Sequence, residues 1–372
     1  GQLIWFHAAS VGESVSVLAL ARRMTEKNDA TEVLITSGTA SSAEILAQRM
    51  PPGCRHQFAP LDRADALRRF LAHWRPDASI LVESELWPQM LVAAHKAGVP
   101  LALVNARMSN ASLKNWARFD ATARYLLGLF RLIRTQDQRT MDGLLDLGAD
   151  PATTALGPNL KAMSDPLPVD ERAYHEVEDA YSGMLWVAAS THPGEEEKVI
   201  DAHLRVMEAV RSARLILVPR HPDRAADIAA MVERKGLSVA RRSLSRDPGE
   251  ADVYIADTLG EMGLWYQLAP VVFMGGSFGK AGGHNPYEPA QMNTALISGR
   301  RVANFADVYD AFNEAGAVRI VKNAKELAGA VTILLTDLEE QRAQKSVAAA
   351  LAQSRLAELD DLTDLLVQRL LT

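Results

Sequence analysis

Residues 257–289 read DTLGEMGLWYQLAPVVFMGGSFGKAGGHNPYEP. Their order of apolar and turn-forming residues predicts a helix that opens at 260–262, a short strand at 270–274, a glycine-rich loop and a second helix. Asn285 suits the N-cap of that second helix, and Glu288 suits the return hydrogen bond of a capping box. A strand that runs into a glycine loop between two helices is typical of parallel α/β sheets.

The same stretch predicts an anion site. Free N–H groups at the two helix starts and in the glycine loop favour an anion, most naturally a phosphate. His284, Asn285 and Glu288 could hydrogen-bond a sugar or ribose beside it. Alternatively, the glycines only turn the chain and the Asn-Pro pair only caps a helix. The loop lacks the G-x-G-x-x-G dinucleotide fingerprint, which argues against a dehydrogenase, and the chain has no Walker A motif.

Length and composition narrow the classes of protein. A chain of 372 residues predicts two domains. The single cysteine, Cys54, excludes an internal disulfide and fits a reducing compartment. The sequence holds no signal peptide and no apolar run long enough to span a bilayer. It also lacks HExxH, paired cysteines and Asp-x-Asp pairs, so we expect no metal site.

Charge is distributed unevenly along the chain. Residues 1–160 carry 17 Lys/Arg and 15 Asp/Glu, whereas the remainder carries 23 and 31, which indicates an anionic partner for the first half. Residues 107–134 form the most basic stretch, with aromatic and leucine side chains between the basic ones. Either this stretch meets anionic lipid, or it is an ordinary amphipathic helix with its charges in water. The acidic total argues against nucleic acid as a partner.

Short apolar strands alternate with helices in the first half. The strands are expected at 3–7, 33–36, 78–82 and 101–104, which predicts a doubly wound parallel sheet. Ligands of such sheets bind at the carboxyl ends of the strands. Besides Glu13, the residues that follow these strands and could face a crevice are Ser10, Gly12, Glu83, Glu85 and Arg107.

Glu13 is the candidate general base. It follows a turn of small residues after the first strand, and no basic residue lies beside it in sequence. A carboxylate there could take a proton from a hydroxyl nucleophile. Alternatively, a carboxylate near a helix start only favours the helix dipole, and this applies equally to Glu83 and Glu85.

The second half is again α/β. Further strands are expected at 184–189, 214–218, 251–255 and 295–297, the last of them closing the sheet. We place a first Rossmann-like domain at 1–160 and a second at 161–340. We expect a final helix within 341–372 to cross back to the first domain.

An acid in the first domain and an anion cradle in the second predict a cleft enzyme. The second domain would hold an activated donor by its phosphate while the first positions an acceptor. This is the plan of a GT-B glycosyltransferase, two Rossmann-like doubly wound domains facing a central cleft. It needs no metal or other cofactor, because amide groups and Arg stabilise the leaving phosphate.

Seven segments carry a resemblance to a known family. They are HAASVGE (7–13), ESELWP (83–88), NARMS (105–109), AASTHPGEE (188–196), VPRHP (218–222), DTLGEM (257–262) and GGSFGKAGGHNPYEP (275–289). In this order the chain resembles the 3-deoxy-D-manno-octulosonic acid (Kdo) transferases of lipopolysaccharide biosynthesis in Gram-negative bacteria.

The resemblance implies transfer of Kdo from CMP-Kdo to a lipid A precursor, with inversion at the anomeric carbon. Glu13 matches the family's catalytic base. No cofactor, metal or nucleic acid is implied, and the setting would be the cytoplasmic face of the anionic inner membrane. Donor contacts are implied for Ser190, Arg220, His221, Gly260, Glu261, Met262, Asn285 and Glu288.

The sequence departs from the family in two places. Family members usually begin with an apolar anchor and a basic linker that this sequence does not contain. We therefore expect peripheral binding through the protein's surface, or an anchor removed from the chain. The family's Gly-Asn-Leu-Lys segment reads GPNLK at 157–161, with one residue inserted, which leaves the places of Asn159 and Lys161 in the cleft open.

Two other hypotheses remain. The chain could be a different GT-B enzyme, either a transferase with another sugar nucleotide or a sugar-nucleotide epimerase. It could also be a non-catalytic relative that binds a sugar nucleotide or a lipid and keeps only the fold.

Overall fold

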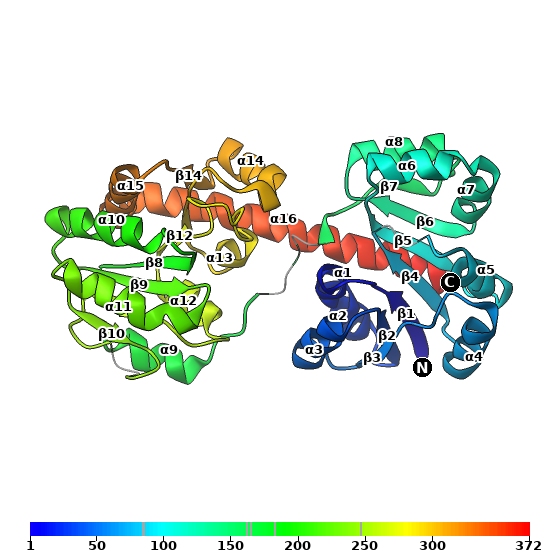
Figure 1. The fold of residues 1–372 in the computed structure, drawn as a ribbon, viewed down its shortest axis with the longest axis horizontal. Helices are drawn as coiled ribbons and strands as arrows, with labels where there is room; N and C mark the ends of the chain where they lie inside the picture. The colour runs from blue at the N-terminus through cyan, green and yellow to red at the C-terminus, as the bar shows by residue number, and fades with distance from the viewer. Residues whose placement is uncertain (84–85, 161–162, 164–165, 182–183, 246–247) are drawn as a thin grey trace. The chain divides into compact units, whose positions relative to one another are not determined.

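The computed structural model describes the whole chain except residues 84–85, 161–162, 164–165, 182–183 and 246–247. The chain forms two compact units, which we describe separately (Figure 1). The first comprises Gly1–Ser164 with Arg355–Thr372, and the second comprises Asp165–Ser354.

The first unit contains a seven-stranded sheet in which all neighbouring strands are parallel. Across the sheet the strands are β3 (Cys54–Phe58), β2 (Thr31–Ser37), β1 (Gln2–His7), β4 (Ala78–Val82), β5 (Leu101–Ala106), β6 (Phe130–Thr135) and β7 (Thr154–Leu156). The connecting helices are α1 (Val11–Ser16), α2 (Leu18–Lys27), α3 (Ala40–Arg49), α4 (Ala64–Trp74), α5 (Pro88–Lys96), α6 (Asn110–Ala117), α7 (Asp120–Leu127) and α8 (Gln138–Asp146).

Both faces of this sheet are buried, as a parallel sheet requires. Side chains alternate between the faces with a period of two, so Ile4 and Phe6 of β1 join one core and Trp5 joins the other. Residues of α2 and α3 pack in the first core, and residues of α4, α5, α7 and α8 pack in the second.

The second unit repeats this plan with its own parallel seven-stranded sheet. Its order is β10 (Val239–Arg241), β11 (Val253–Ile255), β9 (Ala213–Pro219), β8 (Met184–Thr191), β12 (Val271–Met274), β13 (Ala295–Ser298) and β14 (Val318–Ile320). Its helices are α9 (Glu171–Glu178), α10 (Glu196–Ala209), η2 (Pro222–Arg224), α11 (Ala225–Arg234), α12 (Met262–Leu268), α13 (Tyr287–Gln291), η3 (Ala303–Phe305), α14 (Ala306–Glu314) and α15 (Ala324–Thr336).

The last helix, α16 (Leu338–Leu370), is a continuous rod of 33 residues that belongs to both units. Its residues up to Ser354 count with the second unit, and those from Arg355 count with the first (Figure 1). In the first unit, one face of this helix is buried in the same core as β1. The buried side chains are Leu359, Leu362, Leu366 and Leu370.

Strand order identifies where each sheet is most open to a ligand. Connections run outward in one direction from β1 to β2 and β3, and in the other direction from β4 onward. The second unit reverses in the same way between β8 and β12. In open parallel sheets, ligands bind at the carboxyl ends of the strands beside such a switch point.

The structure confirms the doubly wound parallel sheets and the predicted strands at 3–7, 184–189 and 270–274, with ends shifted by a residue or two. The prediction that the sheet closes at 295–297 was wrong, because β14 follows as a three-residue edge strand.

A single amphipathic helix over residues 107–134, one of the two alternatives for that stretch, was also wrong. The stretch forms α6, α7 and the strand β6, whose apolar side chains are buried between β5 and β7. No helix in the described part of the chain has the length and apolarity needed to cross a bilayer.

Candidate active site

Glu13 lies beyond the carboxyl end of β1, in the first turn of α1. Ser10 caps this helix, because its hydroxyl oxygen accepts a hydrogen bond from the Glu13 N–H (3.3 Å). The Ser10 hydroxyl donates to Glu13 Oε1 (2.8 Å), and the Ala9 N–H donates to Oε2 (2.9 Å). The carboxylate is therefore buried, and donors from Ala9 and Ser10 orient it.

The predicted residue Glu83, and Asn105, which was not among the predicted site residues, lie at the carboxyl ends of neighbouring strands. Glu83 comes directly after β4 in a left-handed conformation (φ 58°), and Asn105 near the end of β5 is also left-handed (φ 52°). The Asn105 side-chain oxygen accepts from the Leu160 N–H (3.2 Å), which brings the segment after β7 to this edge. Non-glycine residues in this region are strained and cluster at functional sites.

The positions of the remaining candidates in the first unit are as follows. Gly12 is exposed at the second position of α1, Arg107 is exposed after β5, and Asn159 is half-buried beside Leu160. Glu85 and Lys161 lie outside the described residues.

In the second unit the glycine loop after β12 is held by a side chain that the sequence analysis missed. Glu195 is buried, and its Oε2 accepts from the N–H groups of His192 (2.9 Å) and Gly276 (2.6 Å). Its Oε1 accepts from the Phe278 N–H (2.7 Å). Two of the loop N–H groups that the sequence suggested for a phosphate, those of Gly276 and Phe278, therefore bind the protein's own carboxylate. A phosphate would have to displace Glu195 to use them.

Two glycines allow the ends of β8 and β12 to approach each other. A Cβ on Gly275 would lie 2.6 Å from the Ser190 carbonyl oxygen. Gly276 has a positive φ of 69°, and a Cβ there would lie 3.0 Å from the ring of His284. Ser190 itself is left-handed (φ 52°). Strands β8 and β12 are parallel neighbours, and the switch point of the second sheet lies between them.

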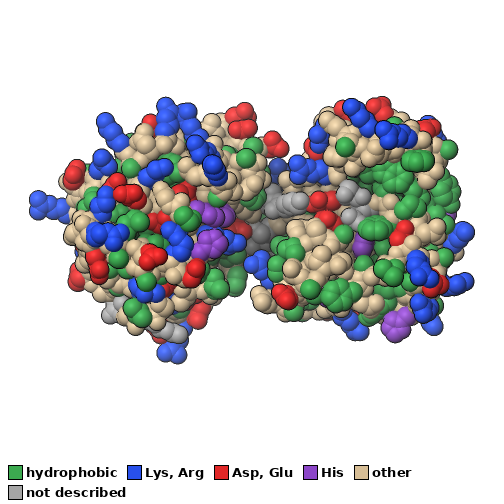
Figure 2. All heavy atoms as spheres, in the orientation of Figure 1, with side chains coloured by type: hydrophobic (Ala, Val, Ile, Leu, Met, Phe, Trp, Pro, Cys, Tyr) green, Lys and Arg blue, Asp and Glu red, His purple; other side chains and the backbone are tan. Residues whose placement is uncertain are grey.

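Three histidines lie close together beside this switch point. The Nε2 atoms of His192 and His284 are 3.0 Å apart, and their rings are stacked with centroids 5.2 Å apart. The His221 ring meets that of His192 edge-on at 5.9 Å. Figure 2 shows histidine side chains gathered on the face of this unit that is in view.

Burial favours the neutral form of the two stacked imidazoles. It lowers the pKa of His284 to about 4, and the neighbouring His192 and Arg220 act in the same direction. Burial also lowers the pKa of His192, although the Glu195 carboxylate opposes this. Desolvation disfavours the charged form of a histidine in this way.

The predicted donor residues Ser190, Arg220 and His221 lie together at this edge. Arg220 follows β9 directly, its N–H donates to the Thr191 carbonyl (2.9 Å), and its side chain is exposed. His221, also exposed, precedes η2. An arginine at the end of a strand beside a switch point suits a phosphate, because its planar guanidinium can donate two parallel hydrogen bonds to two phosphate oxygens.

The other predicted donor residues lie at the starts of α12 and α13. The Glu261 carboxylate binds Arg242 through two contacts (2.6 and 3.1 Å), so it stabilises this loop. Gly260 is exposed with φ 86°, and Met262 opens α12.

The predicted N-cap at Asn285 was wrong by one residue, since Pro286 is the N-cap and α13 begins at Tyr287. Asn285 still accepts a hydrogen bond from the Tyr287 N–H (3.1 Å), so it forms a tight Asx turn before the helix. Glu288 lies in the first turn of α13 and is half-buried.

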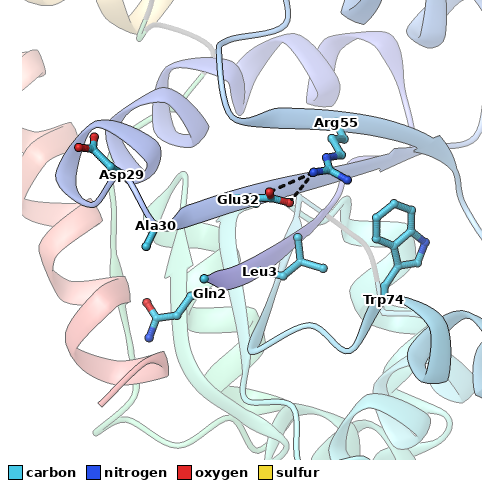
Figure 3. Close-up of a pocket in the computed structure, with 8 residues that line it drawn as sticks. Gln2, Leu3, Asp29, Ala30, Glu32, Arg55 and Trp74 are labelled. Atoms are coloured by element: carbon cyan, nitrogen blue, oxygen red, sulfur yellow. Dashed lines mark hydrogen bonds and ion pairs between the residues drawn. The ribbon is translucent and has the colours of Figure 1, made fainter.

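Two further features concern possible metal binding and a surface pocket. In the described part of the chain, no group of three or more His, Cys, Asp or Glu side chains is arranged to hold a metal ion. The pocket in Figure 3 lies at the amino ends of β1, β2 and β3, on the sheet edge opposite to Glu13, and includes the Glu32–Arg55 ion pair (2.9 Å).

Comparison with known proteins gives consistent matches. Residues 1–164 match the family model described as 3-deoxy-D-manno-octulosonic-acid transferase (kdotransferase). An Arabidopsis thaliana protein named "Probable 3-deoxy-D-manno-octulosonic acid transferase, mitochondrial" is 35% identical over 99% of this chain and 86% of its own length. The 3-deoxy-D-manno-octulosonic acid transferase of Bordetella pertussis is 35% identical over 97% of this chain and 87% of its own.

Solved structures agree on the fold. The UDP-GlcNAc 2-epimerase of Neisseria meningitidis, solved with UDP-GlcNAc bound, superposes with a TM-score of 0.59 at 10% identity, over 96% of this chain and 99% of its own. Anabaena HepE, solved with UDP, gives 0.57 at 13% identity, over 99% of this chain and 100% of its own. Both likenesses support a GT-B-type fold. From its sequence relatives, the chain belongs to the 3-deoxy-D-manno-octulosonic acid transferase family of glycosyltransferases.

Proposed function

We propose that this enzyme transfers Kdo from CMP-Kdo to a lipid A precursor during lipopolysaccharide assembly, with inversion at the anomeric carbon. The family relationship supports Kdo as the transferred sugar, because the relatives are named for that transfer. The observation that carries the mechanism is the geometry of Glu13, a buried carboxylate held by two donors at the carboxyl end of a central strand.

Glu13 is the general base of this proposal. A hydroxyl oxygen of the acceptor attacks the anomeric carbon of Kdo, and its proton passes to the carboxylate. The new carbon–oxygen bond forms as the bond to the phosphate of CMP breaks, and CMP leaves with the electron pair. Attack from the face opposite the phosphate gives inversion. The bonds from Ala9 and Ser10 orient the carboxylate toward the proton that it accepts.

The donor would bind at the carboxyl edge of the second sheet, with the phosphate near Arg220. This assignment is supported by the meeting of Ser190, Arg220 and His221 beside the switch point. Asn285 and Glu288, on the segment that follows the glycine loop, would contact the sugar or ribose. Charge on the departing phosphate is stabilised by the arginine fork and by backbone dipoles, and we propose no metal or cofactor.

We further propose that the enzyme acts at the cytoplasmic face of the anionic inner membrane. The support is the surface formed by α6 and α7, where Phe119 and Tyr125 are exposed among basic side chains such as Arg118 and Arg124. Exposed aromatic rings beside basic residues suit the interface of an anionic bilayer.

The test is incubation with CMP-Kdo and a tetra-acylated lipid A precursor, following CMP release and lipid mass. The wild type should add a Kdo mass, and Glu13→Gln should lose about 10²- to 10⁴-fold in kcat, the usual contribution of a general base. Glu44→Gln, which removes an exposed carboxylate from α3, is the matched control and should keep full activity.

Two results would contradict the proposal. Equal activity of wild type and Glu13→Gln would remove Glu13 as the base but keep the reaction. Turnover of a UDP-sugar in place of CMP-Kdo would favour the sugar-nucleotide alternative, in line with the fold shared with UDP-GlcNAc 2-epimerase.

A further inference from the structure

We propose that His192 and His284 form a coupled imidazole pair that takes up one proton when the phosphate of the donor binds beside it. The pair would thereby supply a positive charge only when the anion is present. This inference rests on the proposed CMP-Kdo donor and extends it, because it assigns a proton-coupled contact with the phosphate to these two histidines.

The contact between the rings limits the pair to a single extra proton. The two Nε2 atoms face each other at 3.0 Å, so one must carry a hydrogen and the other must accept it. The Ser190 backbone favours the protonated form of His284, which fits a ring N–H of His284 that donates to the Ser190 carbonyl. In the proposal, His192 Nε2 is therefore the donor and His284 Nε2 the acceptor. One proton can then enter at His192 Nδ1 and leave this bond intact, whereas a second would place hydrogens on both facing nitrogens.

The surroundings make the pair responsive to an anion. Arg220 and His221 face it from the end of β9, and Glu195 and Glu196 face it from the start of α10. The Glu195 carboxylate already accepts three backbone hydrogen bonds, and Glu196 is paired with Arg224 at 2.6 Å. Burial and the neighbouring Arg220 oppose protonation of the pair more than these two carboxylates favour it, so an added anion shifts the pair toward its charged form.

Contacts with Gly276 and Glu195 fix the histidine pair at the switch point, where the phosphate of the donor is expected. Gly276 packs against both rings, and the N–H of His192 is bound by Glu195. In the glycine loop, the N–H groups of Gly276 and Phe278 are bound by the same carboxylate. An anion at this switch point would therefore meet side chains, the imidazole pair and Arg220, more readily than backbone amides. A nearby anion favours the charged form of a histidine.

The experiment measures proton uptake by isothermal titration calorimetry at pH 7. The probe is cytidine 5′-(methyl phosphate), a diester whose single charge does not titrate near this pH, so any proton taken up belongs to the protein. Titrations in two buffers of different ionisation enthalpy should give an uptake of about one proton per ligand for the wild type. Affinity should rise as pH falls, by up to about tenfold per pH unit.

Variants assign the proton. His192→Gln and His284→Gln should each abolish the uptake and weaken binding about tenfold or more, since a charge-assisted contact is lost. His175→Gln, on the exposed face of α9, is the matched control and should retain the uptake. Nitrogen-15 NMR of the histidine rings in the wild type gives a second measurement that needs no variant, and it should show one imidazolium only in the complex.

Binding without proton uptake would overturn this inference and leave the donor assignment intact. Uptake that persists in both variants would also overturn it. Absence of binding would instead remove the cytidine phosphate donor, and with it both the inference and the proposed function.

Discussion

At the scale of single residues, the serine that caps α1 has two roles. Its hydroxyl oxygen accepts the Glu13 N–H, and its hydrogen is donated to the Glu13 carboxylate. The first contact stabilises the start of the helix, and the second orients the proposed base. These roles can be separated, because Ser109 caps α6 through the Ser112 N–H and belongs to a different helix.

We therefore predict different outcomes for Ser10→Ala and Ser109→Ala. Each should lower the free energy of unfolding by about 1 kcal/mol, the usual value of an N-cap. Only Ser10→Ala should also lower kcat, by about tenfold, because its loss leaves one Glu13 oxygen without its orienting donor. Chemical denaturation and steady-state rates test this, and equal rates for the two variants would contradict it.

Gly276 offers a second prediction at this scale. A Cβ in Gly276→Ala would meet the His284 ring at 3.0 Å and would also strain a backbone with φ 69°. Gly236→Ala is the matched control, since its φ is 81° but no atom lies within 4 Å of the added Cβ. Both should lose about 1–2 kcal/mol of stability from backbone strain.

Only Gly276→Ala should additionally weaken donor binding, because it displaces the stacked histidines. Affinity for a cytidine phosphate diester distinguishes the two variants. Equal affinities would mean that the packing of Gly276 against the rings has no bearing on the donor.

At the scale of elements, the loop after β12 depends on a helix start that is far away in sequence. Three backbone N–H groups from two loops converge on the carboxylate of Glu195, which lies just before α10. A buried carboxylate that accepts three N–H groups ties the ends of β8 and β12 together.

We predict that Glu195→Gln lowers the free energy of unfolding by about 2–3 kcal/mol, because a neutral amide cannot accept all three N–H groups and its own NH2 faces one of them. Glu197→Gln, which removes an exposed carboxylate from the first turn of α10, should change stability by less than about 0.5 kcal/mol. Thermal and denaturant unfolding give the comparison. A Glu195→Gln variant as stable as the wild type would show that the loops hold without this charge.

Sequence patterns revealed the central elements because those elements carry strong local signals. Strands β8 and β12 are apolar runs that end in small or glycine residues. Strand β3 gave no such signal, since CRHQF lies at the sheet edge with few buried residues. In β6 the two arginines lie three positions apart with apolar residues between them, a spacing that resembles an amphipathic helix, but pairing with β5 and β7 makes this segment a strand.

Some contacts of the candidate site could not be predicted from sequence patterns. Motif residues such as Glu13 and Arg220 follow apolar strands, which marks them in the sequence. Nothing local indicates that Glu195 reaches backbone groups about eighty positions later, or that His192 stacks on His284. Both contacts arise only when the sheet brings the ends of β8 and β12 together.

At the scale of the whole molecule, a buried histidine makes stability depend on pH. His203 accepts a hydrogen bond from the Trp186 indole N–H at Nδ1 (3.1 Å), and its Nε2 contacts the Asp252 carbonyl (3.0 Å). This pattern fits the neutral ring only, because Nδ1 must keep its lone pair. Burial lowers the pKa of His203 to about 4, from an ordinary value of 6.5.

The unfolded chain therefore binds a proton more readily than the native protein between these two values. We predict that the contribution of neutral His203 to the free energy of unfolding is fully present above pH 6.5. It should be lost as the pH falls toward 4, by on the order of 3 kcal/mol. Denaturant unfolding at pH 7 and pH 5 measures the loss, and His203→Gln should reduce it while the exposed His175→Gln should not. An equal loss in both variants would assign the effect to other groups.

The continuous helix α16 has a consequence for how the protein is made. It is about 50 Å long at 1.5 Å per residue, and its last turns supply four leucines to the core that contains β1. Chain synthesis runs from the amino end, so the first sheet emerges from the ribosome long before the helix that covers part of it. The second unit lies within the sequence of the first and can fold from a contiguous segment. The first unit is therefore the first whose synthesis begins and the last that can complete its folding, because it needs the end of α16.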